Sequence, residues 1–171
     1  MNLSFSGLAL SYAVHMVATV LWLGGLATLA LWVLPEARKL DRGAYAGLLS
    51  RMQRRLDGIG WFSLVVLTLT GLFQMSASSY YEGFLTIQNT WSAAILVKHV
   101  LFGLMIVVSA YLTWGVLPRL QRLALMQSQG VEPPAGSGSF DALVTTNTRL
   151  LYINLVLALL VLVLTAVARA A

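Results

Sequence analysis

The chain has 171 residues, of which 58% are hydrophobic and only 10% are charged, and its mean hydropathy is +0.81. These values exclude an ordinary soluble domain and indicate an integral membrane protein. The net charge is +5, but the Lys and Arg residues lie in short loops beside apolar runs, so we expect the lipid bilayer as the partner surface and no nucleic acid.

Four apolar segments each have about the ~20 residues that a helix needs to cross a bilayer. They cover residues 8–34, 59–77, 92–117 and 149–168. The first segment stops at Pro35 and the third stops before Pro118, and helices end easily at such positions. We therefore predict an all-α membrane protein, a four-transmembrane-helix up-down bundle that forms a single membrane domain over residues 1–171.

Basic residues follow the first and third apolar segments. Six of them lie between residues 35 and 58, and Arg119, Arg122 and Arg149 flank the later loop. The positive-inside rule makes these loops cytoplasmic, so we expect the N and C termini outside, with a bacterial cytoplasmic (inner) membrane as the location.

The stretches that connect the apolar segments also predict local structure. Residues 130–139 are rich in Gly, Pro and Ser, which predicts a flexible cytoplasmic linker. The stretch from Glu36 to Leu56 fits either a short amphipathic helix on the inner surface or an extension of the first two membrane helices into water. None of the six acidic residues is expected inside a membrane helix, so the sequence does not support a pump built on buried carboxylates.

The two histidines of the chain, His15 and His99, both fall inside apolar segments. An ionisable side chain there is costly unless it has a partner or a function. Each lies near the outer end of its segment, so both are expected ~10 Å below the outer boundary. In an up-down bundle the first and third helices are diagonal, roughly 11 to 14 Å apart, which suits a bis-histidine haem. A plain hydrogen bond to a neighbouring helix is the alternative for either histidine.

Residues around the histidines fit the same interpretation. Aromatic residues on the two histidine faces could line a porphyrin, and glycines there could admit it. A lysine beside the second histidine could pair with a haem propionate or reach lipid headgroups. No catalytic residue is predicted. The predicted haem b site has the metal ligands His15 and His99 and the further cofactor-binding residues Lys98, Trp22, Gly25, Phe102 and Gly103.

Copper is the competing cofactor, because imidazole and thioether ligands suit it. Met16, Met75 and Met105 lie in or near the apolar segments. They form no clustered motif along the sequence, and scattered methionines are typical of packing. The sequence alone therefore gives no specific copper site.

Three short motifs resemble the CopD-like membrane protein superfamily over roughly Tyr12 to Leu123. The motifs are His15 followed by Trp22-Leu23-Gly24-Gly25, then Leu69-Thr70-Gly71-Leu72, and Asn89-Thr90-Trp91 followed by Leu96-Val97-Lys98. The superfamily includes the copper-resistance CopD domain and, more distantly, HemJ-type protoporphyrinogen oxidases. The resemblance implies a compact helical bundle, with copper import in CopD proteins and haem-linked oxidation in the HemJ branch.

In the HemJ branch a histidine in the first helix and a lysine in the third matter, and His15 and Lys98 match those positions. The chain departs from the pattern by placing His99 directly after the lysine and by lacking the extra helices of full-length CopD. This departure favours two axial histidines over copper transport.

Three functions stay open, with a HemJ-like enzyme as a fourth option. The preferred one is a membrane b-type cytochrome near the outer face that transfers electrons to redox protein or quinone partners, alone or as a subunit of a larger respiratory or photosynthetic complex. With both axial positions filled, electron transfer is expected rather than catalysis. The alternatives are a CopD-type membrane protein for copper transport or resistance, and a cofactor-free accessory subunit.

Overall fold

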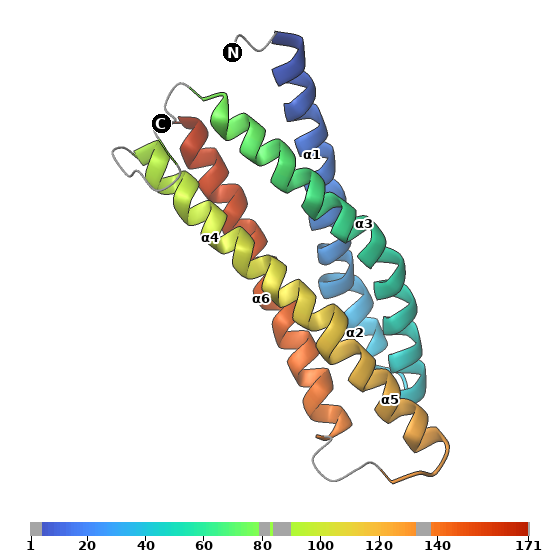
Figure 1. Cartoon of the computed structure of the whole chain (residues 1–171). Coiled ribbons are helices and arrows are strands. Elements are labelled where there is room, and N and C mark those ends of the chain that lie inside the picture. Colours follow the sequence, from blue (N-terminus) through green and yellow to red (C-terminus); the bar gives the residue numbers. More distant parts are fainter. Residues whose placement is uncertain (1–4, 79–82, 84–89, 133–137, 171) are drawn as a thin grey trace.

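The computed structural model describes residues 5–78, 83, 90–132 and 138–170, and this part of the chain is helical with no strand (Figure 1). Helix α1 (Phe5–Ala27) continues through a π-helical segment, η1 (Thr28–Val33), into α2 (Leu34–Ala37). After α3 (Arg42–Ser76), helix α4 (Thr90–Ala110) continues through a second π-helical segment, η2 (Tyr111–Val116), into α5 (Leu117–Ser128), and α6 (Phe140–Ala170) follows. Within the described residues four continuous helical stretches are long and apolar enough to span a membrane, which confirms the prediction.

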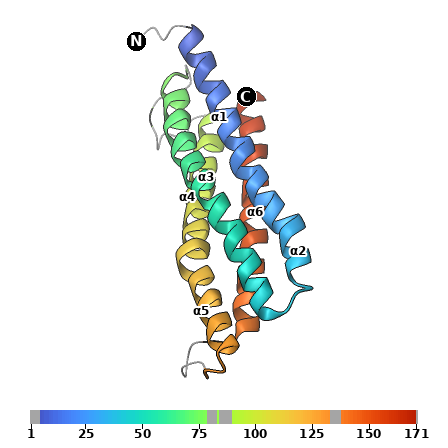
Figure 2. The same cartoon turned by 90° about the vertical axis from the view of Figure 1, so that its right-hand side faces the viewer.

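The bundle consists of two antiparallel helix pairs, α1 with α3 and α4 with α6 (Figures 1 and 2). The start of α1 and the end of α6 lie at one end of the bundle, called here the terminal end, and α2 and α5 lie toward the opposite, loop end. The two pairs join toward the loop end, where α5 packs on α3 and α6. The hydrophobic core is densest there, with Leu34, Leu49 and Leu120 almost fully buried.

The two prolines do not end their helices, contrary to the prediction. Pro35 and Pro118 each lie in the first turn of the helix that follows a π-helical segment. Proline has no N–H and its ring collides with the carbonyl four residues earlier, so a widened turn before it lets the helix continue. The first stretch therefore reaches Ala37 and the third reaches Ser128.

Helix α3 is also longer than the predicted segment. It is one 35-residue helix that begins where the Asp41 side chain accepts a hydrogen bond from the backbone N–H of Ala44, at 2.9 Å. This N-cap satisfies a backbone donor at the first turn. The basic stretch after residue 41 is thus an extension of a membrane helix, the second of the two alternatives.

Asp57 corrects the expectation that no carboxylate lies within a membrane helix. It lies inside α3 because that helix starts at Arg42, well before the apolar segment. Of the predicted linker, residues 133–137 lie outside the described residues; α5 ends at Ser128, and α6 starts where Ser139 Oγ accepts a hydrogen bond from the N–H of Ala142, at 3.1 Å.

Candidate cofactor site between the helix pairs

A cavity of about 500 Å³ lies between the two helix pairs in the terminal half of the bundle. Side chains from α1, α3, α4 and α6 line it, and both histidines are among them. We call it the histidine cavity. The contacts between the two pairs are mainly those of α5 with α3 and of α6 with α1 and η1, and the cavity lies nearer the terminal end, where the pairs pack less closely on each other.

The hydrogen bonds of His15 fix its tautomer. Its Nδ1 lies 2.7 Å from Thr70 Oγ1 on the neighbouring helix α3. The Thr70 hydroxyl donates its proton to the carbonyl of Val66, at 2.6 Å. Thr70 therefore accepts from the imidazole, so Nδ1 of His15 carries the proton and the lone pair of the neutral ring is on Nε2.

His99 has the same tautomer for a different reason. Its Nδ1 lies 2.7 Å from the backbone carbonyl of Ile95, one turn earlier in α4. A carbonyl can only accept, so Nδ1 again carries the proton and Nε2 carries the lone pair of the neutral ring. A ligand histidine typically gives its second N–H to an acceptor in this way.

The walls of the cavity are mainly apolar and aromatic. Trp22 from α1 and Phe102 from α4 meet edge to face, with ring centroids 6.5 Å apart. Gly71 of α3 lies against His15, because a Cβ atom built on it would be 3.6 Å from His15 Cε1. The structure thus brings together five of the seven predicted site residues, namely His15, His99, Lys98, Trp22 and Phe102.

The two predicted glycines lie elsewhere. A Cβ atom on Gly25 would meet Leu56 at 3.6 Å, and Gly25 lines a separate, deeper pocket. A Cβ atom on Gly103 would meet nothing within 4 Å. The described residues that line the histidine cavity include neither of these glycines.

The charged residues of the cavity are cationic. Lys98 and Arg169 line it, and the guanidinium of Arg169 lies over the ring of Tyr12, 4.3 Å from its centroid. Among the described residues that line the cavity there is no Asp or Glu. The site is therefore suited to an anionic or amphipathic ligand.

Sequence reasoning missed several members of this site. Thr70 entered the prediction only as part of a family motif, and Arg169 did not enter it; their roles depend on contacts between helices that no local motif shows. Met16, Met75 and Met105, which form no clustered motif along the sequence, all line the cavity. In the part of the chain that the structure describes, no three His, Cys, Asp or Glu residues form a metal-binding group.

A comparison with family models matches residues 50–168 to the family described as "Copper resistance protein D". The match contains α4 with Lys98 and His99 but begins after α1, which carries His15. No curated protein and no solved structure matches the chain. Since the matched region covers well over half of the sequence, the chain belongs to the CopD family of copper resistance membrane proteins.

Proposed function

We propose that the histidine cavity binds a b-type haem with His15 and His99 as axial ligands, and that the protein transfers electrons within the membrane. The observation that supports this most is the shared tautomer of the two histidines. Both rings use Nδ1–H in a hydrogen bond to a protein oxygen, and both line one cavity. Two neutral imidazoles with the lone pair on Nε2 are the donor set that a haem iron takes in a bis-histidine site.

The rest of the cavity agrees with a haem in size and chemistry. Its volume of about 500 Å³ falls within the roughly 300 to 1,000 Å³ of typical cofactor pockets and is far larger than a bare metal ion needs. Trp22 and Phe102 provide aromatic surface for a macrocycle. Lys98 and Arg169 provide cations for two propionates, and this explains why basic side chains line an otherwise apolar cavity.

The proposed electron transfer is based on the number of protein ligands that the haem would have. His15 and His99 would together hold the iron of a haem with no position left for oxygen or substrate, so a haem bound there would supply electron transfer. The basic residues of the loops favour a cytoplasmic loop end, which supports a terminal end on the outer side of the membrane. A redox protein or a quinone that docks at that end would then exchange electrons with the site.

Copper handling is the second candidate, and two observations favour it. The chain belongs to a copper resistance family, and Met75 and Met105, which are 8% and 0% exposed, line the cavity together with both histidines. Thioether and imidazole groups are the ligands that copper(I) prefers. Copper would then be cargo that passes through the cavity, and Lys98 and Arg169 would oppose its binding through their positive charge.

Absorption spectra of the purified protein test the first candidate. We expect the oxidised and dithionite-reduced protein, expressed with ample haem supply, to show sharp reduced α and Soret bands. His15→Gly and His99→Gly should each lose these bands, because each variant lacks one axial ligand. Free imidazole fits the space left by the deleted ring and should restore the bands, which separates ligand loss from misfolding.

Either of two results would refute the haem proposal. One is a well-folded wild-type protein without haem bands after expression with ample haem. The other is a haem spectrum that persists unchanged in both glycine variants, which would mean that the haem is held elsewhere. In the first case, metal analysis of the same sample would show whether copper is bound instead.

A further inference from the structure

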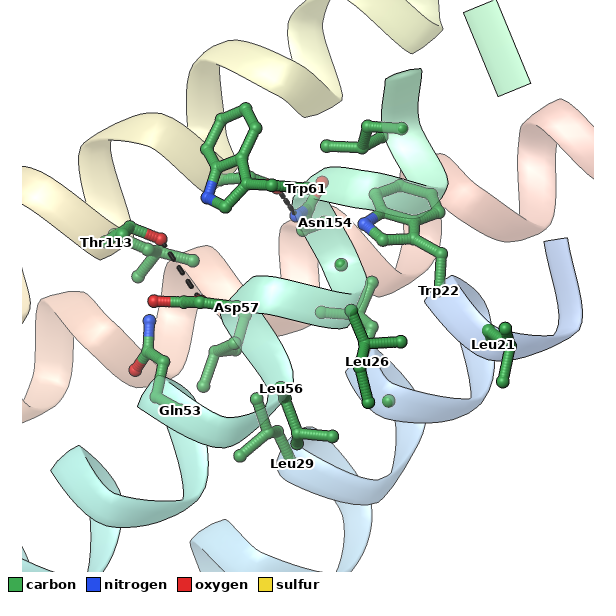
Figure 3. Close-up of a pocket in the computed structure, with 17 residues that line it drawn as sticks. Leu21, Trp22, Leu26, Leu29, Gln53, Leu56, Asp57, Trp61, Thr113 and Asn154 are labelled. Carbon is green, nitrogen blue, oxygen red and sulfur yellow. Dashed lines mark hydrogen bonds between the residues drawn. The ribbon is translucent and has the colours of Figure 1, made fainter. Parts of the chain in front are cut away.

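A second, smaller pocket lies further from the terminal end than the histidine cavity. Figure 3 shows the residues that line it. Its volume is about 70 Å³, and residues of α1, η1, α3, α4, η2 and α6 line it. We call it the Asp57 pocket after its one carboxylate. Gly25 of α1 packs against Leu56 of α3, the residue before Asp57. Gly25 lies about ten residues beyond His15, which is ~15 Å along a helix. Asp57 therefore lies ~15 Å further from the terminal end than His15. The pocket therefore lies within the membrane-spanning part of the bundle.

Five polar side chains line this pocket, those of Gln53, Asp57, Ser109, Thr113 and Asn154. Asp57 Oδ1 accepts a hydrogen bond from Thr113 Oγ1 at 3.3 Å, drawn as a dashed line in Figure 3. Gln53 and Asn154 line the same pocket and are only 3% and 2% exposed. Asn154 donates a hydrogen bond to Ser109 Oγ at 2.8 Å. One carboxylic acid side chain and two amide side chains thus lie in this small pocket.

Two oxygen atoms of the pocket have no protein donor. Gln53 Oε1 and Asn154 Oδ1 are both buried without a hydrogen-bond partner. A buried acceptor without a donor costs about 1–3 kcal/mol, so such atoms usually bind a water or an ion. A volume of about 70 Å³ has room for several waters, since one water needs roughly 10–15 Å³ of such space.

The carboxylate needs a positive partner as well. Among the described residues that line the pocket, Asp57 is the one titratable group; no Lys, Arg, His, Glu or Tyr lies there. The ion pairs of the described residues, Lys39–Glu36 and Arg42–Asp141, do not involve Asp57. A carboxylate within a membrane is costly as an unpaired anion and is stable when it binds a proton.

We propose that the Asp57 pocket is a hydrated proton-binding site, in which Asp57 is the group that gains and loses the proton. A hydronium ion in the pocket transfers its proton to a carboxylate oxygen of Asp57 and becomes water, and no electron moves. The waters that remain donate hydrogen bonds to Gln53 Oε1 and Asn154 Oδ1. Trp22 lines both this pocket and the histidine cavity, so a proton bound at Asp57 is one side chain away from the cofactor site.

Infrared difference spectroscopy of the protein in lipid nanodiscs tests this site. We expect a carboxylic acid C=O band that appears as the pH is lowered, shifts after transfer to D2O, and is lost in Asp57→Asn. Thr113→Val should keep the band and shift its frequency, because it removes only the hydrogen-bond donor. Asp141→Asn is the matched control: this carboxylate is exposed at the loop end, and its removal should leave the band in place.

Three outcomes would overturn the proposal. The first is a wild-type protein without any carboxylic acid band that depends on Asp57. The second is a band that neither titrates nor exchanges with D2O, which would make Asp57 a sealed structural acid. The third is a band that responds to sodium at constant pH, which would make the pocket a site for a hard cation. The measurement reads the carboxyl group directly, so its result is independent of whether the histidine cavity binds haem.

Discussion

Thr70 on α3 holds His15 on α1 by a 2.7 Å hydrogen bond, and it accepts this bond because its own proton goes to the carbonyl of Val66. The two helices are thus joined at the predicted ligand, and the acceptor sets both the orientation and the tautomer of the imidazole. A threonine that looks like an ordinary interhelical partner therefore determines which nitrogen of His15 carries the lone pair.

Replacing Thr70 with valine keeps the shape of the side chain and removes the acceptor. We expect the Thr70→Val protein to fold but to retain haem roughly 10- to 100-fold less tightly, which is the usual cost of losing an outer partner of a metal-binding histidine. Haem titration of the apoprotein measures this effect. The control is Thr145→Val, because the Thr145 hydroxyl donates to the carbonyl of Asp141 in its own helix, at 2.9 Å, and Thr145 is not among the described residues that line the histidine cavity. Equal affinities for the two variants would contradict the role given to Thr70.

Gly71 provides space beside His15. A Cβ atom there would lie 3.6 Å from His15 Cε1, an ordinary contact, so Gly71→Ala should bind haem like the wild type. The longer side chain of Gly71→Leu would occupy the position of the imidazole, and we expect it to abolish the haem bands. Gly103→Leu is the matched control, because a Cβ atom on Gly103 meets nothing within 4 Å. A normal spectrum of Gly71→Leu would mean that His15 is not held as the structure shows.

Lys98 should raise the reduction potential of a haem in the cavity. A fixed positive charge favours the reduced iron, which has one positive charge fewer, so Lys98→Met should lower the potential. We expect a change on the order of 1–2 kcal/mol, typical of charges several ångström apart at intermediate dielectric. Redox titration measures the shift, and Lys98→Arg should restore most of it. Lys39→Met is the control, because Lys39 is exposed and paired with Glu36. If the reduction potential of Lys98→Met equals that of the wild type, the haem propionates do not lie beside Lys98.

The sequence was sufficient to predict the helical fold because hydropathy and length alone determine which segments can cross a bilayer. Helix ends were less accurate. Local signals at Pro35 and Pro118 predicted stops, and π-helical segments before each proline remove the clash that would cause them. The start of α3 at Arg42 could not be read from hydropathy, since the first turns of that helix are polar.

For the candidate site, the sequence located the side chains that are unusual in themselves, a histidine or a lysine in an apolar segment. It did not locate groups whose importance comes from a neighbour on another helix. Thr70 and Asp57 are examples, because each depends on a contact between residues more than fifty positions apart. Gly25 and Gly103 were chosen from helical spacing alone; Gly25 lines the Asp57 pocket instead, and neither glycine is among the described residues that line the histidine cavity.

The two buried methionines of the histidine cavity distinguish the haem proposal from copper handling. Leucine has nearly the same volume as methionine, so the double variant Met75→Leu and Met105→Leu should lose less than about 1.5 kcal/mol of stability per site while it removes both thioether groups. We expect its haem content and spectrum to match the wild type, because His15 and His99 would hold the haem without either methionine. For a copper(I) site, the same change should lower the copper stoichiometry or affinity at least tenfold, since the soft ligands are gone. Parallel haem and copper(I) titrations of the double variant and the wild type measure both quantities.

Loss of copper binding with no haem in either protein would favour copper as cargo. Full retention of haem would leave Met75 and Met105 as packing residues around the cofactor.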